Sequence, residues 1–289
     1  MMWRLLFLLT NLKPIDQTGV SKMTDIAITG AAGRMGRRLV ALGHEDADLH
    51  VVAGVDAPNH PAAGKDLGGL VGVGEMGVGL SGELPADVKV DVVIDFSVPA
   101  AMREVIRTAR ERNIGLVIGT TGLSEADHKL IDEAAADIPV LYASNFSLVV
   151  NVLNLLSAKA AELLGDEYDI EIVEAHHRFK KDAPSGTAIT LAKCIADAAG
   201  RDFEKDVIFE RHGDDCLRKP NEITVQAIRI GDHPGEHTAY FAALGERLEL
   251  KHVSTSRDSY VLGALRAAKW LDGKPAGRYD MKSVLGLHD

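Results

Sequence analysis

The sequence predicts an α/β protein in which a doubly wound parallel sheet is joined to an α+β domain with a mostly antiparallel, open sheet. Between residues 25 and 145, short β-branched runs alternate with longer helical patterns, which is typical of parallel βαβ units. After residue 148, a long helical run precedes segments in which apolar and polar residues alternate, which indicates strands with one buried face. The final helical run, residues 258–271, is expected to pack back on the first domain.

The first half contains five predicted strands and helices with recognisable start signals. Pro99 stands at a first-turn position, and Ser124 followed by Asp127 forms an S-x-x-D cap; both signals favour a helix start. The strand runs are nearly continuous in apolar residues, as expected for a sheet covered on both faces. They cover residues 25–30, 49–56, 90–96, 115–120 and 138–143.

The second half begins with a predicted helix over residues 148–164. A further helix over 187–199 places apolar residues on one face and stops at Gly200. Gly245-Glu246 lies between two alternating runs and predicts a tight hairpin. The alternating runs cover residues 168–175, 221–230, 237–244 and 247–253.

Composition excludes several classes of protein. The chain has 289 residues, long enough for two domains, and a net charge of −10 with no long basic face, which argues against a nucleic-acid partner. Two cysteines without C-x-x-C spacing favour a reducing compartment, and we expect a cytoplasmic protein. We expect no segment to be long enough to span a membrane. Residues 1–22 are expected to be an upstream start or a disordered tail.

Two glycine motifs are candidates for the nucleotide-binding site. The literal G-x-G-x-x-G at Gly72 to Gly77 lacks a helical pattern after it and is interpreted as a surface loop. ITGAAGRMGRRLVALG instead joins a strand to a helix through Gly30, Gly33 and Gly36. Backbone N–H groups at such a turn receive a pyrophosphate, so this motif predicts a Rossmann-type dinucleotide domain.

An acidic residue indicates which dinucleotide is preferred. Asp56 ends the second strand, twenty residues beyond Gly36, where a carboxylate accepts hydrogen bonds from the ribose hydroxyls and repels a 2′-phosphate. Arg34 and Arg37 would offset part of that repulsion. We therefore expect NADH as the preferred cofactor, with NADPH possible. Further ligand-binding candidates are the strand-end segments Asp95 to Ser97 and Gly119 to Gly122.

The stretch EAHHRFKKDAPSGTA, Glu174 to Ala188, concentrates cations in a strand-to-helix loop. Ser185, Gly186 and Thr187 stand at the helix start, where free N–H groups and hydroxyls favour an anion. Geometry argues against a metal site, since adjacent His176 and His177 point to opposite faces of an extended chain. A solvated loop remains the simpler alternative. A titratable histidine beside a lysine and an anion socket indicates acid-base chemistry on a carboxylate substrate.

The combination of GAAGRMG, DFS, GTTG, ASNFS and EAHHRFKKDAPSGTA, in this order, resembles the dihydrodipicolinate reductase family. The similarity runs from about residue 24 to the C-terminus. It implies a cytoplasmic homotetramer that transfers hydride from a nicotinamide to a cyclic imine with two carboxylates, in the diaminopimelate route to lysine. It also implies a nucleotide domain of residues 23–147, completed by 256–289, and a substrate-binding and oligomerisation domain of residues 148–255.

The resemblance also implies roles for individual residues. Its motif places the catalytic pair at His176 and Lys180. The positions that match substrate-carboxylate contacts are His177, Ser185, Gly186, Thr187 and Thr121. Those that match nucleotide contacts are Gly30, Ala31, Ala32, Gly33, Arg34, Met35, Asp56, Phe96, Gly119, Thr120, Thr121, Ala143, Ser144, Asn145 and Phe146.

The chain departs from the family pattern at three places, and two other functions stay open. Phe179 stands where some members carry histidine, Lys181 adds a second cation, and Ala57 replaces an arginine that receives the 2′-phosphate in some members; only the last bears on cofactor choice. One alternative is another NAD(P)-dependent amino-acid dehydrogenase, acting on aspartate or homoserine. The other, more distant, is a non-enzymatic dinucleotide sensor.

Overall fold

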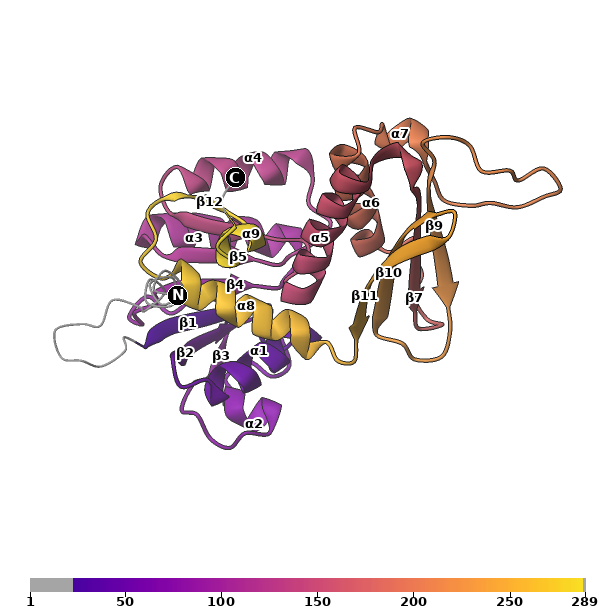
Figure 1. Ribbon diagram of the computed structural model, residues 1–289. Helices are drawn as coiled ribbons and strands as arrows, with labels where there is room; N and C mark the ends of the chain where they lie inside the picture. Colours follow the sequence, from indigo (N-terminus) through magenta and orange to yellow (C-terminus); the bar gives the residue numbers. More distant parts are fainter. Residues whose placement is uncertain (1–22, 288–289) are drawn as a thin grey trace, which may run out of the picture. The chain divides into compact units, whose positions relative to one another are not determined.

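A computed structural model describes residues 23–287 of the chain, so the expectation for residues 1–22 lies outside the described part. The chain divides into two compact units (Figure 1). Within the described residues, unit 1 comprises 23–144 and 264–287, and unit 2 comprises 145–263.

Unit 1 is built on a seven-stranded parallel sheet of order β12-β6-β5-β4-β1-β2-β3. The order reverses direction between β4 and β1, which makes the sheet doubly wound and places a crevice at the carboxyl ends of these strands. The strands are β1 (Thr24–Thr29), β2 (Leu49–Val55), β3 (Leu80–Ser81), β4 (Val92–Asp95), β5 (Gly115–Ile118), β6 (Pro139–Tyr142) and β12 (Gly277–Tyr279). The predicted parallel sheet is confirmed.

Helices cover both faces of this sheet, which is why its central strands are apolar on both sides. On one face, Ala27 and Leu116 pack with Met102 of α3 and Ile131 of α4. On the other, Gly43 of α1 lies against Ile26 and Val51. The helices of unit 1 are α1 (Arg34–Glu45), α2 (Leu67–Val71), α3 (Pro99–Arg112), α4 (Glu125–Ala135) and α9 (Met281–Val284).

The predicted helix starts have the expected local chemistry. Pro99 occupies the first turn of α3, where its missing N–H costs nothing. At α4 the Ser124 side chain accepts from the Asp127 N–H, and the Asp127 carboxylate accepts from Ser124 in return. This reciprocal capping box satisfies two donors that the helix itself leaves unpaired.

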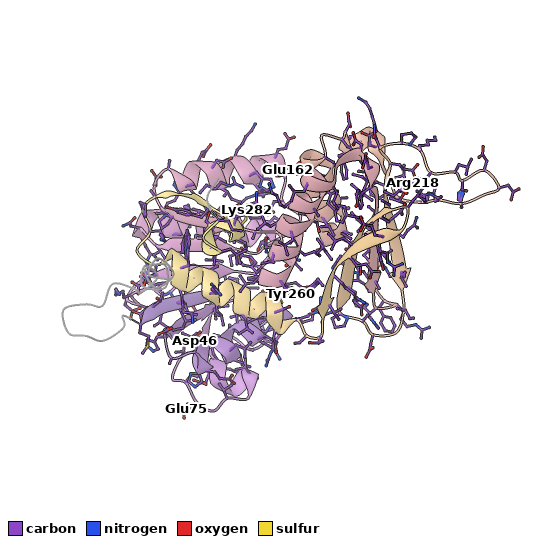
Figure 2. All side chains as sticks on the ribbon, in the orientation of Figure 1. Asp46, Glu75, Glu162, Arg218, Tyr260 and Lys282 are labelled. Atoms are coloured by element: carbon purple, nitrogen blue, oxygen red, sulfur yellow. The ribbon has the colours of Figure 1, made fainter. Side chains whose placement is uncertain are left out.

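The final long helix, α8 (Asp258–Leu271), has the bounds that the periodicity predicts. Its C-terminal part belongs to unit 1, where Lys269 Nζ lies 2.5 Å from a carboxylate oxygen of Asp46; Figure 2 labels Asp46 in this unit. Just after the helix, Asp272 accepts a 2.9 Å hydrogen bond from Thr24 at the start of β1. The described residues from 264 onward therefore belong to the first unit.

The literal glycine motif is a loop. Gly72 ends α2 in the left-handed conformation, and Gly74 and Gly77 also have positive φ angles. The chain then enters β3, not a helix. Without a helix start, the motif offers no row of free N–H groups to a phosphate.

Unit 2 carries a five-stranded sheet of order β11-β10-β7-β9-β8. It is mixed rather than mostly antiparallel: β10 is antiparallel to β7 and β11, whereas β9 is parallel to β7 and β8. Alternation reveals one covered face but not strand direction, and the crossover through α6 returns β9 parallel to β7. The strands are β7 (Asp169–His176), β8 (Val207–Ile208), β9 (Ile223–Arg229), β10 (Gly235–Ala243) and β11 (Glu246–Ser254).

Helices cover one face of this mixed sheet and make the core of unit 2. Ile172 of β7 and Phe241 of β10 pack against Leu153 of α5 and Leu191 of α6. The helical elements of the unit are α5 (Leu148–Leu164), η1 (Gly165–Glu167), α6 (Gly186–Ala198) and α7 (Phe203–Asp206). The predicted hairpin joins β10 to β11 through Leu244 and Gly245, with a φ of 99° at the glycine.

One expectation from the sequence was wrong. By length and composition, Leu148–Glu167 is a 20-residue helical segment apolar enough to cross a membrane. In unit 2 this segment contributes Leu153, Ala160 and Ala161 to the core between helices and sheet. Only 28% of its apolar window is buried, and Val149, Leu156 and Leu163 are exposed, so one side of the helix packs in the core and the other does not.

Candidate active site

The turn between β1 and α1 is shaped by glycines at close backbone approaches. A Cβ on Gly36 would lie 2.0 Å from the Gly30 carbonyl oxygen, and one on Gly30, whose φ is +71°, would lie 2.4 Å from the Phe96 carbonyl oxygen. Gly33 is the N-cap of α1, and no side chain caps it. The helix start is thus left to an external acceptor, which fits a dinucleotide pyrophosphate.

Asp56 follows β2 and supports the same turn. Its carboxylate accepts hydrogen bonds from the N–H of Ala32 at 2.9 Å and of Ala57 at 2.8 Å. Arg37 Nε donates to the Ala32 carbonyl at 2.8 Å, while the Arg34 side chain is exposed. A carboxylate can accept further bonds, so Asp56 remains able to receive ribose hydroxyls.

A buried carboxylate joins the ends of three neighbouring strands. Asp95, fully buried at the end of β4, accepts from Thr29 at the end of β1 at 2.5 Å, from Ser97 at 2.6 Å and from Thr120 after β5 at 2.6 Å. Burial raises the pKa of Asp95 against the effect of these hydroxyls. The three donors hold the strand ends together at the edge where such sheets bind ligands.

The remaining predicted nucleotide residues of unit 1 lie at the same strand ends. Gly119 follows β5, and a Cβ there would lie 2.3 Å from the Phe96 ring, so the glycine makes room for the aromatic side chain. Thr120 is buried, whereas Thr121 is exposed. Ala143 and Ser144 follow β6, the first buried and the second exposed.

In unit 2, strand alternation places the first histidine of the basic stretch on the helix-covered face. His176 is buried at the end of β7 on the side of Ile170 and Ile172. Its Nδ1 lies 2.6 Å from the carboxylate of fully buried Glu174, two residues earlier. Burial alone would raise the pKa of Glu174, but hydrogen bonds from His176 and Arg229 outweigh it and lower this pKa to about 2.

Two further histidines extend this polar end of the covered face. The His237 ring on β10 lies 5.3 Å from that of His176 and 5.9 Å from that of His252 on β11. Burial, with a contribution from neighbouring His176, lowers the pKa of His237 to about 3. His237 is therefore neutral near pH 7, and its Nε2 lies 3.0 Å from Ser185 Oγ.

The second predicted catalytic group, Lys180, is held in an ion pair. Its Nζ lies 2.7 Å from the nearer Asp182 oxygen, and its side chain is 19% exposed. The hydrogen bond from Lys180 lowers the pKa of Asp182. The neighbouring His177 is partly buried, and its N–H donates to the His233 carbonyl at 2.7 Å.

The predicted anion socket is the N-terminus of α6. Ser185 is its N-cap and accepts from the Ala188 N–H at 3.1 Å. Gly186 is exposed, and Thr187 Oγ1 accepts from Asn145 Nδ2 at 3.0 Å. Asn145 thus contacts the socket within unit 2, while Phe146 next to it is buried, with 2% of its surface exposed.

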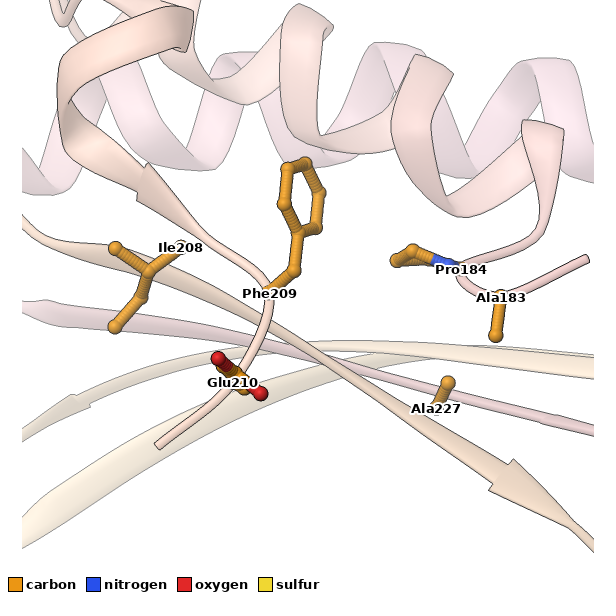
Figure 3. A pocket seen from close by; sticks show the side chains of 6 residues that line it. All are labelled: Ala183, Pro184, Ile208, Phe209, Glu210 and Ala227. Carbon is orange, nitrogen blue, oxygen red and sulfur yellow. The ribbon is translucent and has the colours of Figure 1, made fainter. Parts of the chain in front are cut away.

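A pocket of about 560 Å³ lies near the same loop but is chemically unlike a dianion site. Figure 3 shows Phe209 and Pro184 among the side chains that line it, together with Glu210. Its lining is mostly apolar, and its charged group is an acid. We therefore place the candidate site at the His176 and α6 end of the sheet.

The predicted site residues fall into two groups. Within unit 2, Glu174 forms hydrogen bonds with both His176 and Ser185. Asn145 donates to Thr187, two residues after Ser185. The turn residues, Asp56 and the strand-end residues gather in unit 1, and Thr121 belongs to that unit although it was expected to contact substrate.

Sequence reasoning missed five residues of these networks. Asp95 was seen only within a strand-end motif, and its buried role was not foreseen. The others are Glu174, Asp182, Arg229 and His237. A signal existed for Glu174, because its i, i+2 spacing places it on the same strand face as His176. Arg229 and His237 come from strands paired only in the folded sheet.

Comparisons with known proteins point to one family over nearly all of the described chain. The family model "Dihydrodipicolinate reductase, N-terminus" matches residues 24–146, and "Dihydrodipicolinate reductase, C-terminus" matches residues 149–285. A 4-hydroxy-tetrahydrodipicolinate reductase of Alkalilimnicola ehrlichii is 46% identical over 265 residues, covering 91% of this chain and 99% of the relative. A reductase of the same name from Acinetobacter baylyi is 44% identical, covering 91% and 97%.

Among solved structures, the dipicolinate-bound dihydrodipicolinate reductase of Paenisporosarcina sp. TG-14 shares the fold, with a TM-score of 0.69 at 22% identity over 89% of this chain and 97% of that one. Both family models together span nearly all of residues 24–285. This chain therefore belongs to the dihydrodipicolinate reductase family.

Proposed function

We propose that the protein uses NAD(P)H to reduce 4-hydroxy-tetrahydrodipicolinate, or the dihydrodipicolinate derived from it, to tetrahydrodipicolinate in the diaminopimelate route to lysine. Family membership and relatives of that name at 44–46% identity support this activity. An amino-acid dehydrogenase is not favoured, because both family models match this chain in order.

The observation that carries the proposal is the arrangement of His176. Its Nδ1 lies 2.6 Å from a carboxylate oxygen of Glu174, and the N–H of the N-cap Ser185 donates to the same carboxylate at 2.9 Å. The Glu174 side chain therefore holds both His176, the proposed acid-base group, and the start of α6, the proposed anion site. A substrate with a reducible imine next to a carboxylate needs both.

The 4-hydroxy compound loses water to give dihydrodipicolinate, and reduction of dihydrodipicolinate consumes one hydride and one proton. A bound dihydronicotinamide supplies the hydride. Electron density then moves through the conjugated C=C–C=N system toward nitrogen, and a proton must follow. We assign His176 Nε2 as the donor of that proton, and Lys180 as a second donor or as a stabiliser of the developing charge. Asp182 accepts a hydrogen bond from Lys180 Nζ at 2.7 Å, which orients the side chain.

The substrate's two carboxylates are assigned to the cationic and N–H-rich side of the loop. Proposed contacts are His177, Ser185, Gly186, Thr187 and Thr121. The helix dipole of α6 and the free N–H groups of its first turn favour negative charge. Residues 148–255 would thus form the substrate domain, and residues 23–147 with 256–289 the nucleotide domain.

For the nucleotide we propose a preference for NADH over NADPH. Gly30 to Met35 would surround the pyrophosphate and Asp56 the adenosine ribose. Asp56 lies at the end of β2, supports the turn through Ala32, and is followed by Ala57 rather than by a cation. A 2′-phosphate would meet the Asp56 carboxylate. The other proposed contacts are Phe96, Gly119, Thr120, Thr121, Ala143, Ser144, Asn145 and Phe146.

We further propose a cytoplasmic homotetramer. Cys194 and Cys216 are not joined in a disulfide in the described part of the chain, in keeping with a reducing compartment. The face of the unit 2 sheet that no helix core covers exposes Ile228 of β9 and Val253 of β11, at 45% and 49%. Apolar side chains on an open sheet face are what an interface between subunits would cover.

The activity is tested by a coupled assay with dihydrodipicolinate synthase, which follows NADH absorbance. We expect turnover by the wild-type protein, and a fall of roughly 10²- to 10⁴-fold for His176→Gln and for Lys180→Ala, because each removes a proposed proton donor or charge. NADH binding, measured by fluorescence titration, should stay within about twofold. Full activity in both variants would contradict the assigned roles, and no turnover by the wild type would contradict the function.

A further inference from the structure

Glu174 is a buried carboxylate that accepts four hydrogen bonds. Its side chain is fully buried on the helix-covered face of β7. The donors are His176 Nδ1 at 2.6 Å, the Ser185 N–H at 2.9 Å, and two Arg229 nitrogens, Nη1 and Nη2, at 2.8 Å each. No role for this residue follows from the proton and carboxylate chemistry assigned above.

Ionised Glu174 dictates which ring nitrogen of His176 carries the proton. Because the pKa of Glu174 lies near 2 through its bonds to His176 and Arg229, the carboxylate is an acceptor throughout the neutral range. The Nδ1 atom facing it must therefore be the N–H of a neutral imidazole. Any additional proton, the one available for transfer, sits on Nε2.

The opposite side of the His176 ring is kept clear. Among residues 23–287, Nε2 has no hydrogen-bond partner. A Cβ on Gly235 of neighbouring β10 would lie 2.9 Å from Nε2, so the glycine leaves space there. Glu174 thus binds Nδ1 of the His176 ring, and Gly235 leaves room beside Nε2.

The same carboxylate also connects the histidine to the socket and to the lysine loop. It receives the Ser185 N–H at the start of α6. Arg229, which pairs with it, donates a 2.6 Å hydrogen bond to the Asp182 carbonyl, and the Asp182 side chain holds Lys180. A shift of Glu174 would therefore move three parts of the proposed site together.

We propose that Glu174 is a positioning residue for the reduction: it fixes the tautomer and orientation of His176 so that Nε2 presents the proton to the substrate bound at the α6 N-terminus. This inference rests on the proposed function. A purely structural role, as an ion-pair partner for Arg229, makes different predictions and can be separated from it.

The first test is Glu174→Gln, which keeps the shape and one acceptor oxygen but removes the charge that selects the tautomer. We expect kcat to fall by at least about 10²-fold with KM changed less than about threefold, because losing an orienting carboxylate beside a catalytic histidine impairs proton transfer rather than binding. Glu222→Gln is the matched control: Glu222 is also a largely buried carboxylate, paired with Arg211 and accepting the Lys219 N–H at 3.0 Å. It should retain wild-type kcat.

The second test does not depend on activity. Long-range ¹H–¹⁵N spectra of ¹⁵N-histidine-labelled protein, with the His176 signals assigned by their loss in His176→Gln, report the neutral tautomer. We expect Nδ1–H in the wild type and loss of that tautomer in Glu174→Gln, whose amide can donate to Nδ1. An unchanged tautomer in the variant would overturn the proposal, even if the protein had no reductase activity at all.

A double variant separates positioning from general destabilisation. If Glu174 acts through His176, Glu174→Gln should change kcat less than about threefold in a His176→Gln background, because the residue it positions is already gone. Equal effects in both backgrounds would show that Glu174 acts independently of His176 and would contradict the inference. If the wild type and Glu174→Gln were equally active reductases, the proposed function would stand and only the positioning role of Glu174 would be contradicted.

Discussion

At the scale of single residues, burial and pairing make chemically similar groups behave differently. Glu174 and Asp95 are both fully buried carboxylates. The pKa of Glu174 falls because a histidine and an arginine donate to it, whereas that of Asp95 rises through burial because its donors are neutral hydroxyls. A cationic partner outweighs desolvation, and a hydroxyl does not.

His237 makes a testable contribution to acid stability. Its folded-state pKa, about 3, lies below its usual value of 6.5 because the ring is buried. As the pH falls below 6.5 the unfolded chain binds a proton that the folded chain excludes, so His237 reduces stability progressively down to pH 3, by up to about 1.4 kcal/mol per pH unit. Urea unfolding of His237→Gln, followed by circular dichroism, should therefore show a shallower decline over this range.

An internal control for this prediction comes from higher pH. Between pH 7 and 8 His237 is neutral in both states, so the wild type and the variant should differ by a constant free energy of unfolding. A variant whose stability declined with acid as steeply as the wild type would rule out His237 as the source.

At the scale of elements, the β1 turn and the end of β2 are joined by hydrogen bonds and together form the proposed nucleotide-binding device. The glycine turn cannot accept side chains at Gly30 or Gly36 without meeting backbone oxygens. Asp56 reaches back from β2 to the Ala32 N–H. The spacing between the glycines and Asp56 could be recognised from the sequence because all of these residues lie within one βαβ unit.

The cofactor preference belongs to this device. We expect the wild-type protein to have a higher kcat/KM with NADH than with NADPH, and Asp56→Asn to shift the ratio toward NADPH by about tenfold, since one charge near a 2′-phosphate is worth roughly 1 to 2 kcal/mol at an exposed site. Asparagine keeps an oxygen for the Ala32 N–H, so the turn should survive. Steady-state kinetics with both cofactors measure the ratio.

A matched variant checks that the effect is one of charge. Arg34→Ala, an exposed residue of the same turn, should shift the ratio toward NADH, because it removes the cation that would offset the repulsion. A strong NADPH preference in the wild type would contradict the role proposed for Asp56.

At the scale of the whole molecule, the open face of the unit 2 sheet is the proposed site of assembly. We expect analytical ultracentrifugation to give four times the 31.0 kDa chain mass. Val253→Asp should dissociate the assembly, because it places a charge on an apolar face that the interface would desolvate. Met23→Asp, at an exposed apolar residue of unit 1, should sediment like the wild type. A monomeric wild type would exclude the tetramer.

Local features of the molecule were the ones that sequence could predict. Helix bounds such as Leu148–Leu164 and Asp258–Leu271 follow from periodicity, and the capping box at Ser124 follows from adjacent residues. The direction of β9 could not be predicted in this way, because alternation records which face is buried and not which strand lies alongside. Which side of the apolar run from Leu148 enters the core, through Leu153, Ala160 and Ala161, was likewise decided only by what packs on it.

By itself, the sequence determined the parallel nucleotide unit, the glycine turn with Asp56, and the placing of His176, Lys180 and Ser185 in one strand-to-helix loop, because these depend on neighbours a few residues apart. Only the tertiary structure decided that Glu174, Arg229 and His237 converge on His176. They come from β7, β9 and β10, which are brought into register by sheet pairing. The state of a titratable group depends on such spatial neighbours, since charge, hydrogen bonding and burial act through space and not along the chain.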